Sequence, residues 1–272
     1  MATDKKIILI TGGNTGLGLA IVKALAESPN AYDIIVGSRS VSKGEQAVEE
    51  VKKEFPQTVS TFSTIQIDYE SDESLEKAAA ELSNKYDHLD VLINNGGVNF
   101  DWEVMEGKKS VREAFNRAYD TNVSGTHILT HLLAGLLVKS SQGRLLFIAS
   151  GTGSLSQTTD EPNFSAALVN KSPPAGWPKP VALAATTYRC SKTAMNMLMR
   201  EWRRILLNDG VKVFSIGPGL LATNLGGIGP EGLKRIGAVD PSVGGNFIRD
   251  VVEGKRDHDE GKVVLKDSIL PW

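Results

Sequence analysis

Seven short runs rich in Val, Ile, Leu and Phe recur along the chain, and longer amphipathic stretches lie between them. The runs are nearly continuous in apolar residues rather than alternating, which is typical of strands buried on both faces. Strand–helix–strand repeats with right-handed crossovers build a parallel sheet covered by helices. We therefore predict an α/β fold with a doubly wound parallel sheet of about seven strands. The predicted strands are Ile7–Ile10, Ile34–Val36, Thr64–Ile67, Val91–Ile93, Leu145–Ile148, Val211–Ile216 and Val263–Leu265.

Two of the intervening stretches show a helical pattern clearly. Apolar residues between Leu17 and Leu25 share one helical face. A second apolar face, between Leu75 and Leu82, follows Ser71, which is a good helix N-cap. Asp72 and the next residue, also acidic, suit the positive end of the helix dipole.

Composition excludes several classes of protein. The 272 residues are 41% apolar and carry a net charge of −2, with 30 basic and 32 acidic residues. No basic excess marks a nucleic-acid or membrane-surface partner. Cys190 is the only cysteine, which excludes an internal disulfide and fits a reducing compartment. The apolar run Ile7–Ile10 is too brief for a signal peptide or membrane span, so we expect a soluble, cytoplasmic protein.

One region breaks the alternation of strands and helices. Residues 154–187 contain five of the eleven prolines of the chain. The alternation resumes afterwards and must complete the same sheet. We therefore interpret 154–187 as an irregular insertion within a single domain that covers residues 1–272.

A glycine-rich turn, Thr11–Gly18, lies directly between the first predicted strand and the first predicted helix. Side chains at such a turn would keep a pyrophosphate away from the backbone N–H groups and the helix N-terminus, both of which favour negative charge. A glycine early in the helix also allows close packing on the strand. The pattern indicates dinucleotide binding, although an ordinary turn between strand and helix remains the alternative.

The end of the second predicted strand indicates which dinucleotide. Sites that prefer NAD usually place a carboxylate here, on the ribose 2′-hydroxyl. This chain has Gly37-Ser38-Arg39-Ser40 instead, with no acid. Arg39 and the flanking hydroxyls would attract a 2′-phosphate, with possible help from Lys43, so we predict NADP(H). An ordinary solvated arginine is the alternative interpretation.

Tyr188 and Lys192 are four residues apart, so they share one face of a helix. A phenol has an ordinary pKa of about 10 and is a poor base near neutrality. A nearby ammonium group stabilises the phenolate and should lower that pKa. The pair predicts a proton-transfer group, whereas two unrelated helix-surface residues would be the alternative.

The turn spacing T-G-x-x-x-G-x-G resembles that of the classical short-chain dehydrogenase/reductase family, and further motifs of that family follow in order up to Thr223. The resemblance implies a Rossmann-type fold. It matches Asp68 to the residue that binds the adenine amino group, and Asn94-Asn95-Gly96-Gly97 to the family motif N-N-A-G. The segment starting at Pro218 matches the one that flanks the nicotinamide. The expected NADP(H)-binding residues are Gly12, Asn14, Thr15, Gly16, Leu17, Gly18, Ser38, Arg39, Asp68, Asn95, Gly96, Tyr188, Lys192, Pro218, Gly219 and Thr223.

The same resemblance implies a catalytic set of Asn122, Ser150, Tyr188 and Lys192. Ser150 would hold the substrate oxygen, and Asn122 would help to hold a water in a proton relay that starts at Lys192. Without the family context, Ser150 is simply a serine at a strand end and Asn122 a polar residue at a helix start. The implied reaction is hydride transfer between the cofactor and a small-molecule carbonyl or alcohol, with Tyr188 supplying the proton and Lys192 also binding the nicotinamide ribose.

Two features depart from the family pattern. Thr15 stands where NADP-preferring members often carry a second basic residue. Ser150 and Tyr188 are 38 residues apart, and carbonyl-reductase-like members have an insertion at the same place, packed over the helices that otherwise form the oligomer interface. We therefore expect a monomer or an altered interface. The aromatic residues Phe100, Trp102 and Trp177 line a substrate pocket or are ordinary packing residues.

Other functions fit the sequence less well. A non-catalytic NADP-binding sensor or scaffold on the same fold has no need to keep the four catalytic residues. A serine hydrolase would need the G-x-S-x-G elbow, which Ser150 lacks. His127 and His131 have the spacing of two zinc ligands but no third ligand, so we expect no metal site.

Overall fold

The computed structural model describes residues 5–158, 167–179 and 185–272. Within them, eight strands form one sheet in the order β3-β2-β1-β4-β5-β6-β7-β8. All neighbouring strands are parallel except β7 and β8, which are antiparallel. The strands are β1 Lys6–Thr11, β2 Tyr32–Ser38, β3 Thr61–Gln66, β4 Val91–Asn94, β5 Arg144–Ile148, β6 Lys212–Ile216, β7 Val263–Val264 and β8 Ile269–Leu270.

The sheet confirms the predicted fold class. Each of the seven predicted strands is present, with ends that differ by a few residues. β4 and β5 are buried along their whole length, as continuous apolar runs require, whereas the edge strand β3 is partly exposed. The sequence analysis missed β8, because a strand of two residues carries no apolar run.

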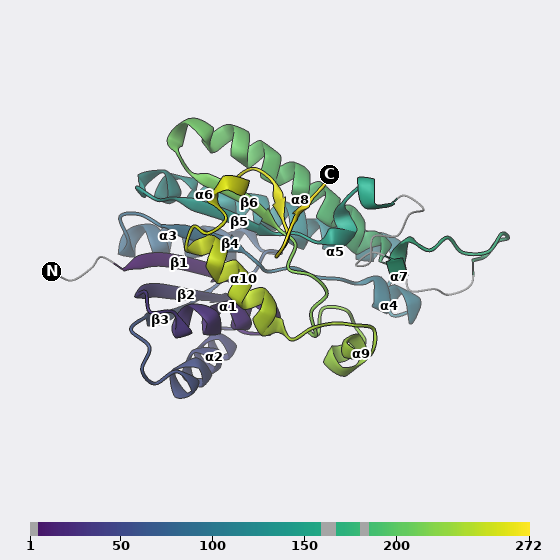
Figure 1. Cartoon of the computed structure of the whole chain (residues 1–272), viewed down its shortest axis with the longest axis horizontal. Helices are drawn as coiled ribbons and strands as arrows, with labels where there is room; N and C mark the ends of the chain where they lie inside the picture. The colour runs from purple at the N-terminus through teal and green to yellow at the C-terminus, as the bar shows by residue number, and fades with distance from the viewer. Residues whose placement is uncertain (1–4, 159–166, 180–184) are drawn as a thin grey trace.

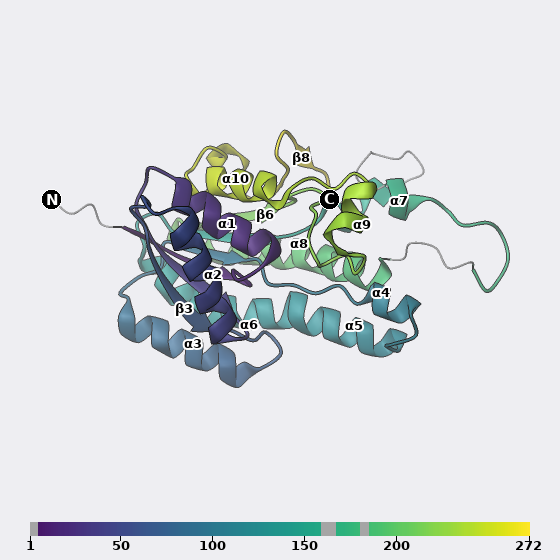
Figure 2. The same cartoon turned by 90° about the horizontal axis from the view of Figure 1, so that it is seen from below.

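Helices cover both faces of the sheet, as Figures 1 and 2 show. Buried residues of α1, α2 and α10 pack on one face, and those of α3, α6 and α8 pack on the other. The helices are α1 Gly16–Glu27, α2 Val41–Glu54, α3 Asp72–Lys85, α4 Asp101–Met105, α5 Val111–Tyr119, α6 Thr126–Lys139, α7 Ala167–Asn170, α8 Thr186–Leu206, α9 Gly229–Arg235 and α10 Pro241–Val252.

Local sequence explains where several helices begin. The Ser71 hydroxyl accepts a hydrogen bond from the backbone N–H of Ser74 at 3.2 Å, which confirms the predicted cap of α3. Ser110 caps α5 in the same way, and Asp240 caps α10 ahead of Pro241. A π-helical turn, Asp120–Gly125, joins α5 to α6 and carries Asn122.

The strand order reverses between β1 and β4, which places a crevice at the carboxyl ends of these strands. The glycine-rich turn follows β1, the predicted 2′-phosphate loop follows β2, and Ser150 follows β5. Parallel strands bring these segments to the same edge of the sheet, although they are far apart in the sequence.

The predicted insertion, 154–187, is described only in part. Its residues 159–166 and 180–184, including Pro162 and Pro180, lie outside the described residues. The helix α7 lies near the start of α8, and residues 171–179 are exposed and extend away from the body of the molecule (Figure 2).

Candidate active site

A cleft of about 870 Å³ opens at the carboxyl ends of the parallel strands. The glycine-rich turn, the loop after β2 and the ends of β3 to β6 all contribute to its walls. Every residue that the sequence analysis assigns to the cofactor lines this one cleft. They are Gly12, Asn14, Thr15, Gly16, Leu17, Gly18, Ser38, Arg39, Asp68, Asn95, Gly96, Tyr188, Lys192, Pro218, Gly219 and Thr223.

The glycine-rich turn needs its glycines for two different reasons. Gly12 and Gly16 have φ angles of +61° and +54°, in the left-handed region that side chains disfavour. A Cβ on Gly18 would overlap the Gly12 carbonyl and lie 2.7 Å from the Asn95 amide nitrogen. The resulting backbone leaves room for a diphosphate beside the N-terminus of α1.

Thr11 and Asn95 join the turn to the end of β4. The Thr11 hydroxyl accepts hydrogen bonds from the backbone N–H groups of Asn95 and Gly96, both at 2.9 Å. The Asn95 side chain donates back to the Thr11 carbonyl at 2.8 Å. These contacts hold two of the predicted cofactor-binding segments in a fixed relation.

Tyr69 explains why the family motif N-N-A-G reads N-N-G-G here. Its buried ring lies against Gly96, where an added Cβ would be 2.8 Å from a ring carbon. The Tyr69 hydroxyl is 2.9 Å from both the Thr11 hydroxyl and the Asn94 side-chain oxygen. The sequence analysis did not single out Tyr69, because only the fold brings it beside Gly96.

The loop after β2 presents positive charge to the cleft. The Arg39 and Lys43 side chains are exposed and line it, and neither makes an ion pair with a described residue. The Ser38 hydroxyl is buried and accepts a hydrogen bond from the Ser40 backbone N–H at 3.3 Å. The guanidinium of Arg39 is therefore available to an anionic ligand.

The helix α8 carries Tyr188 and Lys192 on the same face, as predicted. The Lys192 ammonium nitrogen lies 5.6 Å from the centre of the Tyr188 ring. It also donates a hydrogen bond to the Ile148 carbonyl at 2.7 Å, which fixes its position at the end of β5. Both side chains face the cleft lined by the glycine-rich turn.

Ser150 follows β5 and lies beside the tyrosine. Its hydroxyl lies close enough to the Tyr188 phenol to lower the pKa of that group in part. It also accepts a hydrogen bond from the Thr152 backbone N–H at 3.2 Å and is 2.9 Å from the Thr152 hydroxyl. Two hydroxyls therefore converge where a substrate oxygen could lie, one from β5 and one from α8.

Burial shifts the pKa of both reacting groups away from the charged form. It raises the pKa of Tyr188 to about 12, although the Ser150 hydrogen bond lowers it in part. It lowers the pKa of Lys192 to about 7. The predicted lowering of the tyrosine pKa by the lysine charge is not found for the protein alone: burial raises this pKa, and Ser150 is the group that lowers it in part.

Asn122 lies behind the cleft and does not line it. Its side-chain amide donates to the Val98 carbonyl at 3.0 Å and to the Ser191 hydroxyl at 2.9 Å. Its side-chain oxygen accepts from the Val98 backbone N–H at 2.8 Å. A Cβ on Gly97 would lie 3.1 Å from that oxygen and 3.6 Å from the Lys192 nitrogen, so the two predicted residues flank the same glycine.

None of the three aromatic residues suggested for the substrate pocket lines the cleft. Trp177 is 87% exposed. The buried Phe100 ring lies 5.3 Å from the Lys109 nitrogen and 4.8 Å from the Arg117 guanidinium carbon. Trp102 packs against Gly227. The alternative interpretation, that they are packing aromatics, fits Phe100 and Trp102.

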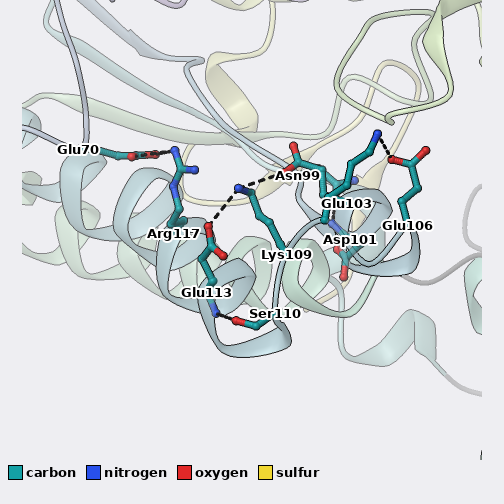
Figure 3. Close-up of polar contacts among 10 residues, drawn as sticks. Glu70, Asn99, Asp101, Glu103, Glu106, Lys109, Ser110, Glu113 and Arg117 are labelled. Atoms are coloured by element: carbon teal, nitrogen blue, oxygen red, sulfur yellow. Dashed lines mark hydrogen bonds and ion pairs between the residues drawn. The ribbon is translucent and has the colours of Figure 1, made fainter.

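Charged side chains brace the segment between β4 and α5 (Figure 3). Lys109 forms ion pairs with Glu103 at 3.2 Å and Glu113 at 3.1 Å. Arg117 forms one with Glu70 at 3.0 Å. The pair of Lys109 with Glu103 ties α4 to the start of α5, and α4 carries a residue that the sequence analysis missed.

That residue is Asp101, the first residue of α4. Its buried carboxylate accepts hydrogen bonds from the Thr187 backbone N–H and hydroxyl, both at 2.9 Å. It accepts a third from the Tyr188 backbone N–H at 3.0 Å. No local sequence signal could have shown this, because the capped helix begins 85 residues further along the chain.

From the sequence, we expect neither a metal site nor a membrane-spanning segment. His127 and His131 lie side by side with ring centres 6.4 Å apart, and His127 accepts a hydrogen bond from Trp202. The described residues contain no group of three side chains suited to hold a metal ion. None of the described helices is long and apolar enough to cross a membrane.

The fold and the site define an α/β protein with a glycine-lined cleft and a Ser, Tyr and Lys set, and comparison with known proteins assigns its family. The family model for short chain dehydrogenases matches residues 6–169. The short-chain dehydrogenase/reductase eupG of Phoma sp is 43% identical over 280 residues, covering 100% of this chain and 99% of that protein. The chain belongs to the short-chain dehydrogenase/reductase family.

Other comparisons cover nearly the whole chain as well. The short-chain dehydrogenase/reductase tropE of Talaromyces stipitatus is 41% identical over 268 residues, covering 98% of this chain and 97% of that protein. An NADPH-bound carbonyl reductase from chicken fatty liver has the same fold, with a TM-score of 0.76 at 20% identity over 99% of this chain and all of that one. The carbonyl reductase Sniffer of D. melanogaster gives 0.74 at 21% identity, over 99% of this chain and all of that one.

Proposed function

We propose that this chain is an NADP(H)-dependent oxidoreductase that reduces a ketone or aldehyde to an alcohol, or catalyses the reverse. The observation that carries the proposal is the convergence of Ser150, Tyr188 and Lys192 at one end of a glycine-lined cleft. The relatives at 41–43% identity are named as dehydrogenase/reductases, and one structural neighbour is an NADPH-bound carbonyl reductase.

The glycine-rich turn would hold the diphosphate and Arg39 the 2′-phosphate, while the segment from Pro218 would border the nicotinamide. When bound, the cofactor supplies or accepts the hydride at the carbonyl carbon. Ser150 donates a hydrogen bond to the substrate oxygen and stabilises its developing charge. Tyr188 donates its proton to that oxygen, and in the reverse direction accepts it back.

The pKa values favour this assignment of roles. With a pKa of about 12, Tyr188 is a neutral phenol at physiological pH and carries the proton that a reduction consumes. Lys192, with a pKa of about 7, changes charge near neutrality and lies one helical turn away. We propose that Lys192 binds the nicotinamide ribose and, with Asn122, helps to return a proton to Tyr188.

The test is consumption of NADPH against a panel of ketones, aldehydes and quinones, with Tyr188→Phe as the matched variant. We expect the variant to bind NADPH as the unmodified protein does and to turn over at least about 100-fold more slowly, the usual contribution of a general acid. Unchanged turnover in Tyr188→Phe would remove the assignment. NADPH binding without turnover of any carbonyl by the unmodified protein would favour the sensor or scaffold instead.

For the domain organisation and assembly, we propose one domain over residues 1–272 and a monomer, or an interface altered by the insertion. The support for the proposal is the spacing of 38 residues between Ser150 and Tyr188; against a monomer, Met197 and Ile205 on α8 are 60% and 47% exposed. Sedimentation velocity tests the assembly, and a stable tetramer would contradict the proposal.

A further inference from the structure

Arg189 follows the proposed catalytic tyrosine, yet its side chain turns away from the cleft. Its guanidinium donates to the Thr152 carbonyl at 3.0 Å, to the Val169 carbonyl at 2.9 Å and to the Asn170 side-chain oxygen at 2.7 Å. One planar group therefore joins three segments: the catalytic helix α8, the loop that carries Ser150, and the short helix α7 of the insertion.

The partners of Arg189 are all neutral oxygens, and it makes no ion pair within the part of the chain that the structure describes. The arrangement is thus a clamp built from directional hydrogen bonds rather than a charge pair. Thr193, one turn further along α8, donates to the Gly153 carbonyl at 2.8 Å and fastens the same loop.

The hydrogen bonds of Arg189 hold two residues that form part of the cleft wall. Val169 and Thr152 both line it, while Arg189 lies behind them. A helix of four residues is too short to be stable by itself, so its position depends on its contacts. Asn170 adds one such contact by donating to the Gln157 carbonyl.

The part of the cleft not assigned to the cofactor has a set of apolar lining residues beside charged ones such as Lys266 and Asp267. Val169 of α7 lines it, together with a group of aliphatic residues after β4 and around α9. That group comprises Val98, Leu225, Ile228, Leu233 and Ile236. Such a wall binds an alkyl or aryl group by removing it from water.

We propose that Arg189 is a positioning residue for substrate specificity: it holds α7 so that Val169 packs against the apolar group attached to the reacting carbonyl. The inference rests on the proposed function for its substrate class. The substrate is then a ketone or aldehyde with an apolar substituent, and α7 selects it.

The kinetic test compares a short and a long straight-chain ketone, 2-butanone and 2-decanone, in Arg189→Met. Methionine is of similar reach but donates no hydrogen bond. We expect kcat/KM for 2-decanone to fall at least tenfold relative to that for 2-butanone, with the Kd of NADPH unchanged within twofold. Arg204→Met is the control, because Arg204 is on the same helix but exposed, and among the described residues it pairs only with Glu201.

A second variant does not depend on the clamp. Val169→Trp fills the space beside the wall, so kcat/KM should fall at least tenfold for 2-decanone and less than threefold for 2-butanone. If both variants slow the two ketones by the same factor, or slow neither, the proposal is overturned. If Arg189→Met fails to fold, the outcome for Val169→Trp decides.

A measurement without turnover separates this inference from the proposed function. In Arg189→Met, backbone amides of residues 167–170 should exchange hydrogen for deuterium at least tenfold faster than in the unmodified protein, whereas Arg204→Met leaves them unchanged. Equal exchange in Arg189→Met and the unmodified protein would disprove the clamp. Inactivity of the unmodified protein towards every carbonyl would instead disprove the proposed function and, with it, the substrate class.

Discussion

The carboxylate of Asp101 accepts a hydrogen bond from the backbone N–H of Tyr188, with 3.0 Å between nitrogen and oxygen. The first N–H groups of a helix have no partner within the helix. A buried acid from another element satisfies them here and suits the positive end of the helix dipole. The relationship fixes where α8 starts and therefore where the tyrosine hydroxyl lies.

Replacing Asp101 should affect both stability and activity. Asp101→Ala leaves three donors around Thr187 and Tyr188 without a partner, at a cost of about 2–4 kcal/mol in the free energy of unfolding. We expect kcat to fall more than the affinity for NADPH, because most of the predicted cofactor-binding residues lie outside α8. Urea denaturation, steady-state kinetics and NADPH titration measure the three quantities. Asp101→Asn, which keeps one acceptor oxygen, should recover part of both losses; an Asn variant no better than Ala would contradict the capping role.

Lys192 should make stability depend on pH in a defined window. Its pKa is about 7 in the folded protein and 10.5 in the unfolded chain, so between these values the unfolded state binds more protons. The free energy of unfolding therefore rises with pH there, by up to about 1.4 kcal/mol per pH unit from this residue. Lys192→Met should lack that contribution.

Urea denaturation of both proteins at pH 7.5, 8.5 and 9.5 isolates the effect, because all other groups titrate in common. The unmodified protein should gain stability relative to Lys192→Met at each step. Tyr188 acts in the opposite sense only above pH 10, where its raised pKa makes the folded state bind the extra proton. Parallel curves for the two proteins would show that Lys192 is not desolvated as described.

Because Tyr69 contacts Gly96, the stability effects of substitutions at these two positions should not be additive. Gly96→Ala restores the family motif but places a methyl group 2.8 Å from the Tyr69 ring, so it should destabilise the protein by about 1–3 kcal/mol. In a Tyr69→Leu background the same substitution should cost less, since the ring is gone. A double-mutant cycle by urea denaturation measures the difference. Equal costs in the two backgrounds would rule out the contact as the reason for glycine.

Arg39 should decide between the two nicotinamide dinucleotides. Losing a charge-assisted hydrogen bond to a 2′-phosphate costs about 1.5–3 kcal/mol, which corresponds to roughly 10- to 150-fold in affinity. We expect Arg39→Ala to weaken NADPH binding by at least tenfold and NADH binding by less than twofold, measured by titration of cofactor fluorescence. Arg112→Ala, an exposed arginine of α5 outside the cleft, is the control. Equal loss for both cofactors would contradict a role for Arg39 on the 2′-phosphate.

Local patterns in the sequence were sufficient for the fold and for much of the cleft. The apolar runs predicted seven parallel strands, because strands buried on both faces need continuous apolar sequence. The turn from Thr11 to Gly18 was recognisable because Gly12 and Gly16 have positive φ angles, a local backbone requirement that favours glycine. Tyr188 and Lys192 share a face because helical spacing places them there.

The tertiary structure decided how those residues are held and what charge they carry. Asp101, Arg189 and Tyr69 act on residues distant in the chain or across the sheet, so no periodicity or spacing could reveal them. The direction of the pKa shifts of Tyr188 and Lys192 also depends on the surrounding packing. Spacing along a helix sets only that the two groups are neighbours, whereas desolvation, which is a property of the whole fold, sets which form each one prefers.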